Sequence, residues 1–241
     1  MIKIDLPNKP QKLTSELQIK LTTIFKNNTD VQVWHRKFIK DAVFSFSNNK
    51  CIFSEIKLGE EGKYPEVEHY YPKSIYPEKV VEWGNLLPIS TFCNKRKGNV
   101  DPCIVPLVNP LIDDPKCFFY ILEGRLWVKN GSQKAINTIN ILGLNDRDHL
   151  RVVRVRIEDK IKTTLEDIWA FHCNDSTRCI RRMKELMQEG GRKEEYSATV
   201  STYILQHKLY KDLKSHLSLL GVWNSEMDEL EKELEFCSLP K

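Results

Sequence analysis

Residues 66–98 gather polar side chains that could carry out metal-dependent chemistry. This segment reads EVEHYYPKSIYPEKVVEWGNLLPISTFCNKRKG and contains a Glu-His pair, Glu68 and His69, followed 25 residues later by Asn94. Hydrolysis of a phosphodiester bond with a metal ion needs oxygen ligands for the metal and a base that takes a proton from water. Glu68 and Asn94 offer the oxygen atoms that Mg²⁺ prefers, and the histidine pKa of about 6.5 suits His69 to the base role.

The composition is that of a globular protein with a real core. The chain has 241 residues, of which 41% are hydrophobic, and a formal net charge of +4. These values exclude a disordered chain and permit nucleic-acid binding without establishing it. No run approaches the apolar length that a bilayer requires, and the first residues lack the apolar segment of a secretory signal. We therefore expect a cytoplasmic protein with no membrane partner, whose seven cysteines are reduced thiols.

The pattern along the chain predicts an α+β protein in three segments. Residues 1–48 form an N-terminal helical segment, with amphipathic helices over residues 12–26 and 31–46. Residues 49–100 form the core, a hairpin and loops that end in a short helix at about residues 87–97. Residues 101–241 begin with a hairpin around Glu123-Gly124 and continue as a C-terminal helical region. The predicted helices of that region span residues 132–144, 146–172, 176–189, 194–220 and 225–236.

The order and spacing of the polar residues in the core resemble the HNH endonuclease family. The matching motifs are Glu68-His69, then Asn85 before a leucine pair, then Cys93-Asn94-x-x-Lys97. The resemblance implies a ββα-metal fold in which Glu68 and Asn94 hold Mg²⁺ or Mn²⁺ and His69 activates water. It also implies that Asn85 braces the loop that aims His69. Lys97 would share a helix face with Asn94 and could meet phosphate.

One departure from the family concerns zinc. Many HNH proteins carry two Cys-x-x-Cys pairs that bind a structural zinc, whereas this chain has Cys51-x-x-Ser54 and Ser90-x-x-Cys93 at those places. Two thiolates and two hydroxyls make a poor zinc cage, because structural sites use four Cys or His ligands. We predict no structural zinc, with Cys51 and Cys93 still adjacent.

A narrower resemblance covers roughly residues 1–155. The stretches MIKIDLP, KCIFSE, EHYYPKS, PLVNPLIDDP and TINILGLND are similar to the HNH subunit of Septu-type and retron-linked anti-phage systems. This resemblance implies a nuclease that works within a defence complex whose partner is an ABC-type ATPase, and we expect its substrate to be DNA. Two alternatives stay open: cleavage of RNA, including transfer RNA, by the same site, and a non-catalytic adaptor that binds nucleic acid or the ATPase.

Several basic and histidine residues outside the motif are ambiguous. Lys73 could contact phosphate or only be solvated in its loop. A basic cluster in the C-terminal region, from Arg147 to Lys184, could bind nucleic acid, although charged helix faces are usually just solvated. The remaining histidines show no acidic or cysteine partners at ligand spacing, so we assign no role to them. They are His35, His149, His172, His207 and His216.

Overall fold

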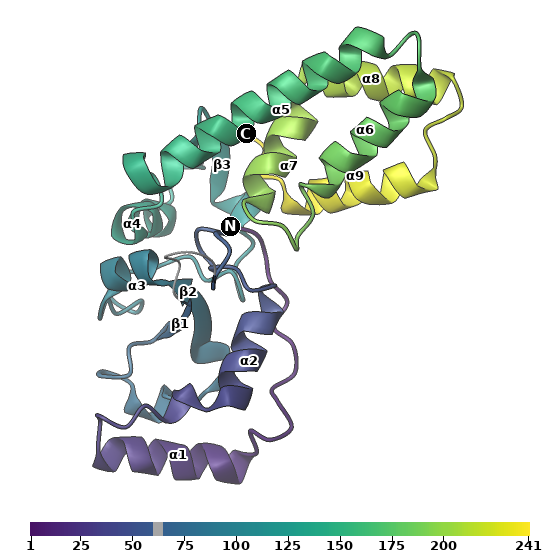
Figure 1. Ribbon diagram of the computed structural model, residues 1–241. Helices are drawn as coiled ribbons and strands as arrows, with labels where there is room; N and C mark the ends of the chain where they lie inside the picture. The colour runs from purple at the N-terminus through teal and green to yellow at the C-terminus, as the bar shows by residue number, and fades with distance from the viewer. Residues whose placement is uncertain (60–64) are drawn as a thin grey trace. The chain divides into compact units, whose positions relative to one another are not determined.

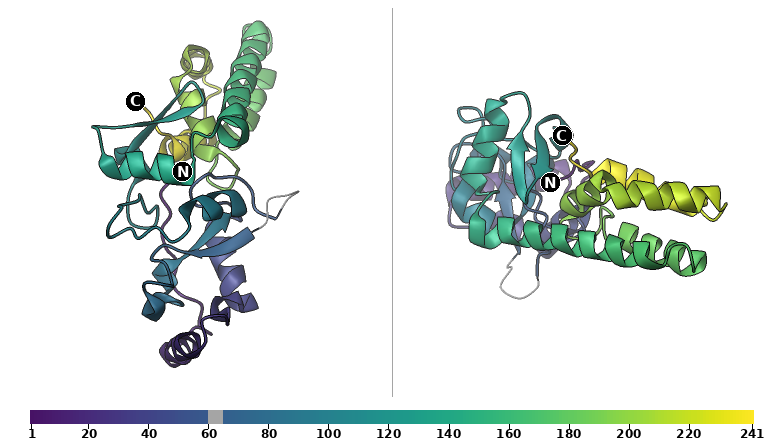
Figure 2. Two further views of the ribbon diagram at one scale, coloured as in Figure 1. Left: turned by 90° about the vertical axis from the view of Figure 1, so that its left-hand side faces the viewer. Right: turned by 90° about the horizontal axis from the view of Figure 1, so that it is seen from above.

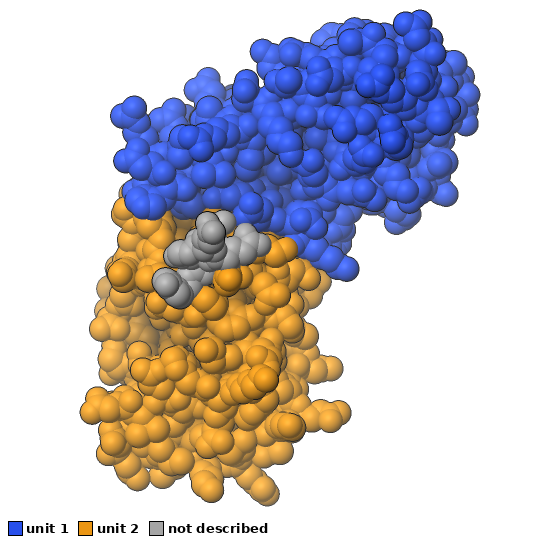
Figure 3. Space-filling view, viewed as in Figure 1, with its two compact units in different colours: residues 1–2, 114–130, 145–241 blue, residues 3–113, 131–144 orange. Residues whose placement is uncertain are grey.

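A computed structural model describes residues 1–59 and 65–241. The chain divides into two compact units, coloured separately in Figure 3. Unit 1 comprises residues 1–2, 114–130 and 145–241, and unit 2 comprises residues 3–113 and 131–144. This division is one of packing within the chain and does not test the three segments expected from the sequence. Those segments stay a prediction.

Unit 2 is built on two N-terminal helices that share one hydrophobic core. Helix α1, Ser15–Asn27, and helix α2, Lys37–Phe46, flank a short 3₁₀ turn, Val33–His35 (Figure 1). Thr14 caps α1 by accepting a hydrogen bond from the Leu17 backbone N–H. These elements pack against the first strand and the loop after it. The buried cluster contains Leu13, Leu21, Phe25, Val33, Trp34, Ile39, Val43, Val67, Val80, Val81, Trp83 and Leu86.

The central part of unit 2 is a two-stranded sheet followed directly by a helix. Strand β1, Pro65–His69, pairs antiparallel with β2, Leu86–Ser90, and Glu68 lies opposite Leu87. Helix α3, Thr91–Lys97, begins where the Ser90 side chain accepts the Cys93 backbone N–H, and it ends before Gly98. The helix predicted over residues 87–97 is therefore wrong for residues 87–90, because these residues pair with β1 as a strand.

Unit 2 also contains helix α4, Gln133–Leu142, which packs on α3. The Thr138 hydroxyl on α4 accepts the Val108 backbone N–H, which fixes the proline-rich loop between α3 and the next hairpin. Gly143 ends the helix with a left-handed backbone, φ +62°, and a Cβ at that position would meet the Arg96 side chain at 2.7 Å. The positive φ favours glycine here, and a Cβ would also require the Arg96 side chain to move.

Unit 1 combines a small hairpin with a helical bundle (Figures 1 and 2). Strands β3, Phe119–Leu122, and β4, Arg125–Val128, flank Glu123-Gly124 as predicted. A π-helical turn, Arg147–Arg151, leads into the long helix α5, Val152–Phe171. The bundle continues with α6, Ser176–Gln188, α7, Ser197–Gln206, α8, Lys208–Leu219, and α9, Ser225–Cys237.

The helix predicted over residues 194–220 is wrong as a single element. His207 has an extended backbone, φ −72° and ψ 132°, and separates α7 from α8. Its ring nitrogen Nδ1 accepts the Leu209 backbone N–H, so the histidine serves as the N-cap of α8. Both α7 and α8 bury an apolar face, so the apolar residues keep a helical spacing on each side of His207. The break between the helices is therefore not visible in the sequence pattern.

The α+β class expected from the sequence is confirmed by these elements. Within residues 1–59 and 65–241, no helix is both long and apolar enough to cross a bilayer.

Candidate functional site

Four of the residues singled out from the sequence line one open pocket of unit 2, namely Glu68, His69, Lys73 and Asn94. The pocket has a volume of about 230 Å³ and lies between β1, the loop after it and α3. Its lining comprises Glu68, His69, Pro72, Lys73, Asn94, Lys95, Gly98 and Asn99. Glu68, His69 and Asn94 come together here although β1 and α3 lie more than 20 residues apart in the sequence. The antiparallel pairing of β1 with β2, which runs directly into α3, produces this proximity.

His69 is held as a neutral imidazole of one tautomer. Its side chain is buried, with 2% of the residue exposed, and Nε2 donates a hydrogen bond to the Val80 carbonyl oxygen at 2.9 Å. Nδ1 therefore carries the lone pair. Burial, together with the positive charges of Lys73 and Lys97, lowers the pKa of His69 to about 4 against the opposing effect of the Val80 bond. A neutral imidazole with a fixed lone pair is the form that accepts a proton.

Glu68 forms a buried ion pair with Lys97. The Lys97 Nζ donates to Glu68 Oε1 at 2.7 Å and to the His69 carbonyl oxygen at 2.8 Å, and Lys97 is completely buried. Burial raises the pKa of Glu68, an effect that the Lys97 charge opposes. Lys97 is thus bonded inside the protein and does not line the pocket where a phosphate would enter. The helix spacing that predicted a phosphate contact places Lys97 on the inner side of α3 instead.

Asn94 is oriented by Glu66, a residue that the sequence analysis did not select. The Asn94 Nδ2 donates to Glu66 Oε2, and the Thr91 hydroxyl donates to Glu66 Oε1 at 2.9 Å. This bond fixes the amide so that Oδ1 is left as the acceptor. Glu66 could have been identified from the sequence by the two-residue period of a β-strand. This period places Glu66 and Glu68 on the same face of β1.

Asn85 ties together the loop that follows β1, in agreement with the bracing role implied by the HNH resemblance. Its Oδ1 accepts the Tyr71 backbone N–H at 2.7 Å, and its Nδ2 donates to the carbonyl oxygens of Tyr71 at 3.1 Å and Lys79 at 3.0 Å. The Lys79 carbonyl is adjacent to that of Val80, the acceptor of the His69 bond. Asn85 is 1% exposed and is not part of the pocket lining, so it acts by positioning.

Two other lysines face the pocket. Lys73 is half-buried, and its Nζ lies 5.0 Å from the centre of the Trp34 ring. The Trp34 ring in turn packs edge-on against His69, with centroids 4.9 Å apart. Lys95, which the sequence analysis did not select, is exposed at the rim. These two cations, rather than Lys97, are placed where an anion could reach them.

The donor atoms of the pocket fit a hard divalent cation. A Glu68 carboxylate and an Asn94 amide oxygen are hard oxygen ligands, and the pocket is open to water, which Mg²⁺ retains in its coordination shell. Glu68 Oε2 and Asn94 Oδ1 are the atoms that would hold Mg²⁺ or Mn²⁺, because Oε1 of Glu68 and Nδ2 of Asn94 are already bonded to Lys97 and Glu66.

The predicted adjacency of Cys51 and Cys93 is observed. Both thiols are buried, and a hydrogen bond joins them. Burial raises the pKa of Cys51, but the hydrogen bonds from Cys93, Ser54 and Ser90 together outweigh burial and lower this pKa. The bond with Cys51 raises the pKa of Cys93. Ser54 and Ser90 lie against the same pair. The absence of zinc at this place stays a prediction.

Comparison with known proteins shows one relationship over nearly the full length of the chain. No protein-family model matches the sequence. The Septu protein PtuB of Bacillus thuringiensis is 36% identical over 244 residues, which cover 95% of this chain and 92% of the relative. The Septu association that the sequence resemblance indicated is thereby confirmed. At this identity and coverage, the chain belongs to the family of the Septu protein PtuB.

Proposed function

We propose that this protein is a metal-dependent HNH-type endonuclease that hydrolyses phosphodiester bonds in DNA as the nuclease of an anti-phage defence complex. The observation that supports the proposal best is the convergence of Glu68, His69 and Asn94 on one open pocket. Each of the three is fixed by a different neighbour: Glu68 by Lys97, His69 by the Val80 carbonyl, and Asn94 by Glu66. A packing cluster or an adaptor surface has no need for a base of fixed tautomer beside two oxygen ligands.

The proposed reaction begins with the proton of water. Nδ1 of His69 accepts this proton as the water oxygen bonds to phosphorus. The bond from phosphorus to the leaving sugar oxygen then breaks, and that oxygen takes a proton from solvent. The neutral state of His69 at physiological pH follows from its lowered pKa, and a bound phosphate anion would raise that pKa and strengthen the base. A Mg²⁺ or Mn²⁺ ion on Glu68 and Asn94 would stabilise negative charge on the phosphate. Lys73 and Lys95 would attract the phosphate backbone to the pocket.

The DNA substrate and the ABC-type ATPase partner are parts of the same proposal. The sequence resemblance implies the ATPase, DNA is the substrate that we expect, and membership of the Septu family supports a role in a defence complex. The phosphate chemistry is the same for DNA and RNA, so RNA cleavage is treated as an outcome of the test below.

The test is a cleavage assay with the full chain, with and without a candidate ABC-type ATPase, nucleotide and Mg²⁺. DNA and RNA are supplied in parallel. We expect Mg²⁺-dependent DNA cleavage that His69→Ala reduces by about 10²-fold or more, which is the contribution of a positioned general base. His149→Ala, which removes an exposed histidine in unit 1, is the matched control and should cleave normally.

Three results would contradict the proposal. Cleavage retained in the His69→Ala variant would contradict the assignment of His69 as the general base. Cleavage of RNA with DNA left intact would show that RNA, and not DNA, is the substrate. Binding of nucleic acid or the ATPase without any cleavage in the complete mixture would favour the adaptor.

A further inference from the structure

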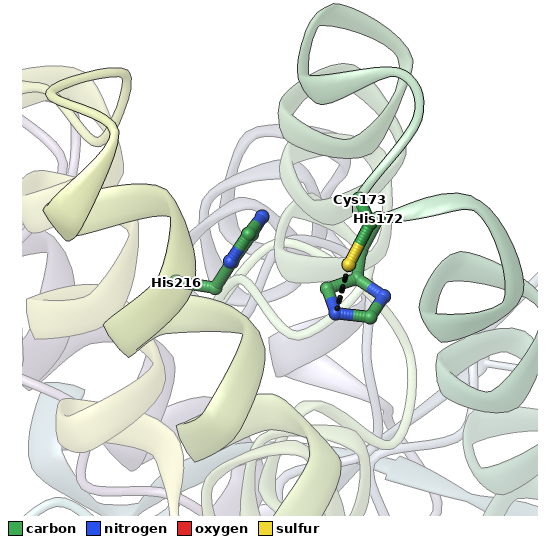
Figure 4. Close-up of side chains that lie close together, drawn as sticks. All are labelled: His172, Cys173 and His216. Atoms are coloured by element: carbon green, nitrogen blue, oxygen red, sulfur yellow. Dashed lines mark hydrogen bonds between the residues drawn. The ribbon is translucent and has the colours of Figure 1, made fainter.

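The loop after α5 and the facing side of α8 bring three side chains with nitrogen and sulfur donors together. His172 follows the last residue of α5, Cys173 comes next, and His216 lies on α8. Figure 4 shows the His216 ring extending toward His172 and Cys173. Their donor atoms all lie within 4.8 Å of one another. We infer that His172, Cys173 and His216 bind a Zn²⁺ ion that ties the end of α5 to α8. This site is separate from the proposed nuclease pocket and does not rest on it.

The tautomer of His172 is set by its backbone neighbour. Nδ1 donates a hydrogen bond to the Trp169 carbonyl oxygen at 2.6 Å, so the lone pair lies on Nε2. Nε2 is 3.1 Å from Cys173 Sγ. The Trp169 ring stacks on His172, with centroids 3.9 Å apart and planes at 15°, and holds the imidazole in place. A histidine that donates its other ring N–H to a backbone carbonyl is the usual arrangement of a metal ligand.

His216 gives a second observation in favour of a metal site, independent of the proximity of the three donor atoms. Its Nε2 is buried and has no hydrogen-bond partner among residues 1–59 and 65–241. The His216 ring meets His172 edge-on, with centroids 4.8 Å apart at an angle of 73°. A buried polar atom without a partner is rare in a folded protein because its desolvation is not compensated. Coordination of a cation would satisfy this atom.

The donor set selects the class of metal. Imidazole nitrogen and thiolate sulfur favour Zn²⁺ over Mg²⁺, which prefers oxygen. With Zn–N of about 2.1 Å and Zn–S of about 2.3 Å, tetrahedral ligand atoms are separated by roughly 3.3 to 3.8 Å. The observed 4.8 Å is about 1 Å wider than this spacing, so the three side chains would close by that amount around the ion. Cys173 is exposed, so water can take the fourth position. Three protein ligands with a water form an open zinc site, to which the four-ligand rule for closed structural sites does not apply.

Binding of the ion requires only that one ligand, the thiol of Cys173, loses its proton. The Cys173 thiol loses its proton to solvent, and the lone pairs of Sγ, His172 Nε2 and His216 Nε2 turn to the metal. No change of oxidation state is involved. The expectation of no structural zinc was argued for Cys51, Ser54, Ser90 and Cys93 and does not concern this cluster.

The test uses the full chain without an affinity tag, under reducing conditions. The protein is stripped with a chelator, mixed with one equivalent of Zn²⁺ and desalted, and zinc per chain is measured by mass spectrometry. We expect one zinc per wild-type chain and loss of that zinc on desalting in Cys173→Ser and His216→Ala. Zinc should also raise the melting temperature of the wild type but not of the two variants, because the ion joins two helices of the bundle.

Cys117→Ser is the matched control, since Cys117 is another exposed cysteine of unit 1, and it should retain the zinc. Co²⁺ gives a further readout, because only a site with a thiolate shows the sulfur-to-cobalt absorption band. Binding at Glu68 and Asn94 would not produce that band. Cys173 is exposed, so its replacement by serine tests the site even if His216→Ala disturbs α8.

Two results would overturn the inference. The first is a wild-type chain that retains no zinc. The second is zinc, or a cobalt band, that persists in Cys173→Ser, which would place the metal at other thiols such as Cys51 and Cys93.

Discussion

Lys97 extends its ammonium group into the interior of unit 2, between the Glu68 carboxylate and the His69 carbonyl oxygen. The sequence spacing from Asn94 predicted a lysine that could meet phosphate, but spacing alone does not say which side of a short helix faces solvent. In the structure, the buried ion pair fixes the carboxylate that we propose as a metal ligand. We therefore assign Lys97 a positioning role within the proposed site.

Replacing Lys97 with Met should destabilise unit 2 by about 3 to 5 kcal/mol, because it leaves the Glu68 carboxylate buried without its partner. Urea unfolding measures the loss. The double variant Lys97→Met with Glu68→Gln should recover much of the stability, since it removes the uncompensated charge as well. A Lys97→Met protein of normal stability with a raised KM for DNA would instead favour a phosphate contact.

Replacing Glu66 with Ala should lower cleavage by about 10- to 100-fold, the usual effect of losing a group that orients a metal ligand. Without Glu66, the Asn94 amide can turn its Nδ2 toward the metal position. Higher Mg²⁺ should restore part of the rate, and a titration of rate against Mg²⁺ measures this shift. Glu78→Ala, at an exposed position, is the control. An unchanged Mg²⁺ dependence in Glu66→Ala would contradict the positioning role.

At the scale of elements, turn chemistry was easier to predict than the boundary between strand and helix. Glu123 and Gly124 both have positive φ, +51° and +70°, which is the backbone of a tight hairpin. Only Gly124 is of a residue type that favours this backbone. Residues 86–90 were harder, because Leu-Leu-Pro-Ile-Ser is apolar on both faces and is completely buried. Periodicity does not separate a buried strand from a helix in so short a run.

Replacing Gly124 with Ala should destabilise unit 1 more than replacing Gly221 with Ala. Both glycines have positive φ, so each substitution costs about 1 to 2 kcal/mol in backbone strain. A Cβ at Gly124 would also meet the Val155 side chain at 2.5 Å, whereas a Cβ at Gly221 would meet nothing within 4 Å. The collision should add about 1 to 3 kcal/mol.

Thermal or urea unfolding of the two glycine variants measures the difference. Equal losses would show that the hairpin shifts away from α5 at no cost and that the contact with Val155 is unimportant.

At the scale of the whole molecule, the two units each have a core of their own. Unit 2 buries its cluster around Trp34, Val67 and Leu86, and the helices of unit 1 bury residues such as Leu165 and Tyr210. The chain passes between the units four times, because residues 3–113 and 131–144 belong to unit 2 while the segments on either side of each belong to unit 1.

We expect calorimetry to show two unfolding transitions, or a calorimetric enthalpy larger than the van't Hoff enthalpy. Gly124→Ala should lower the transition of unit 1, and Lys97→Met should lower that of unit 2. A single transition that both variants shift equally would show that the units unfold as one.

The sequence by itself determined the residues of the proposed nuclease site, because types such as Glu68, His69 and Asn94 and their spacing carry that information. It also determined the α+β class and the hairpin at Glu123-Gly124. Only the tertiary structure decided that Lys97 is buried and that Glu66 orients Asn94, since both depend on which helix face meets β1. It alone brought His216 to His172 and Cys173, because helices 40 residues apart in the chain become neighbours only when their apolar faces pack.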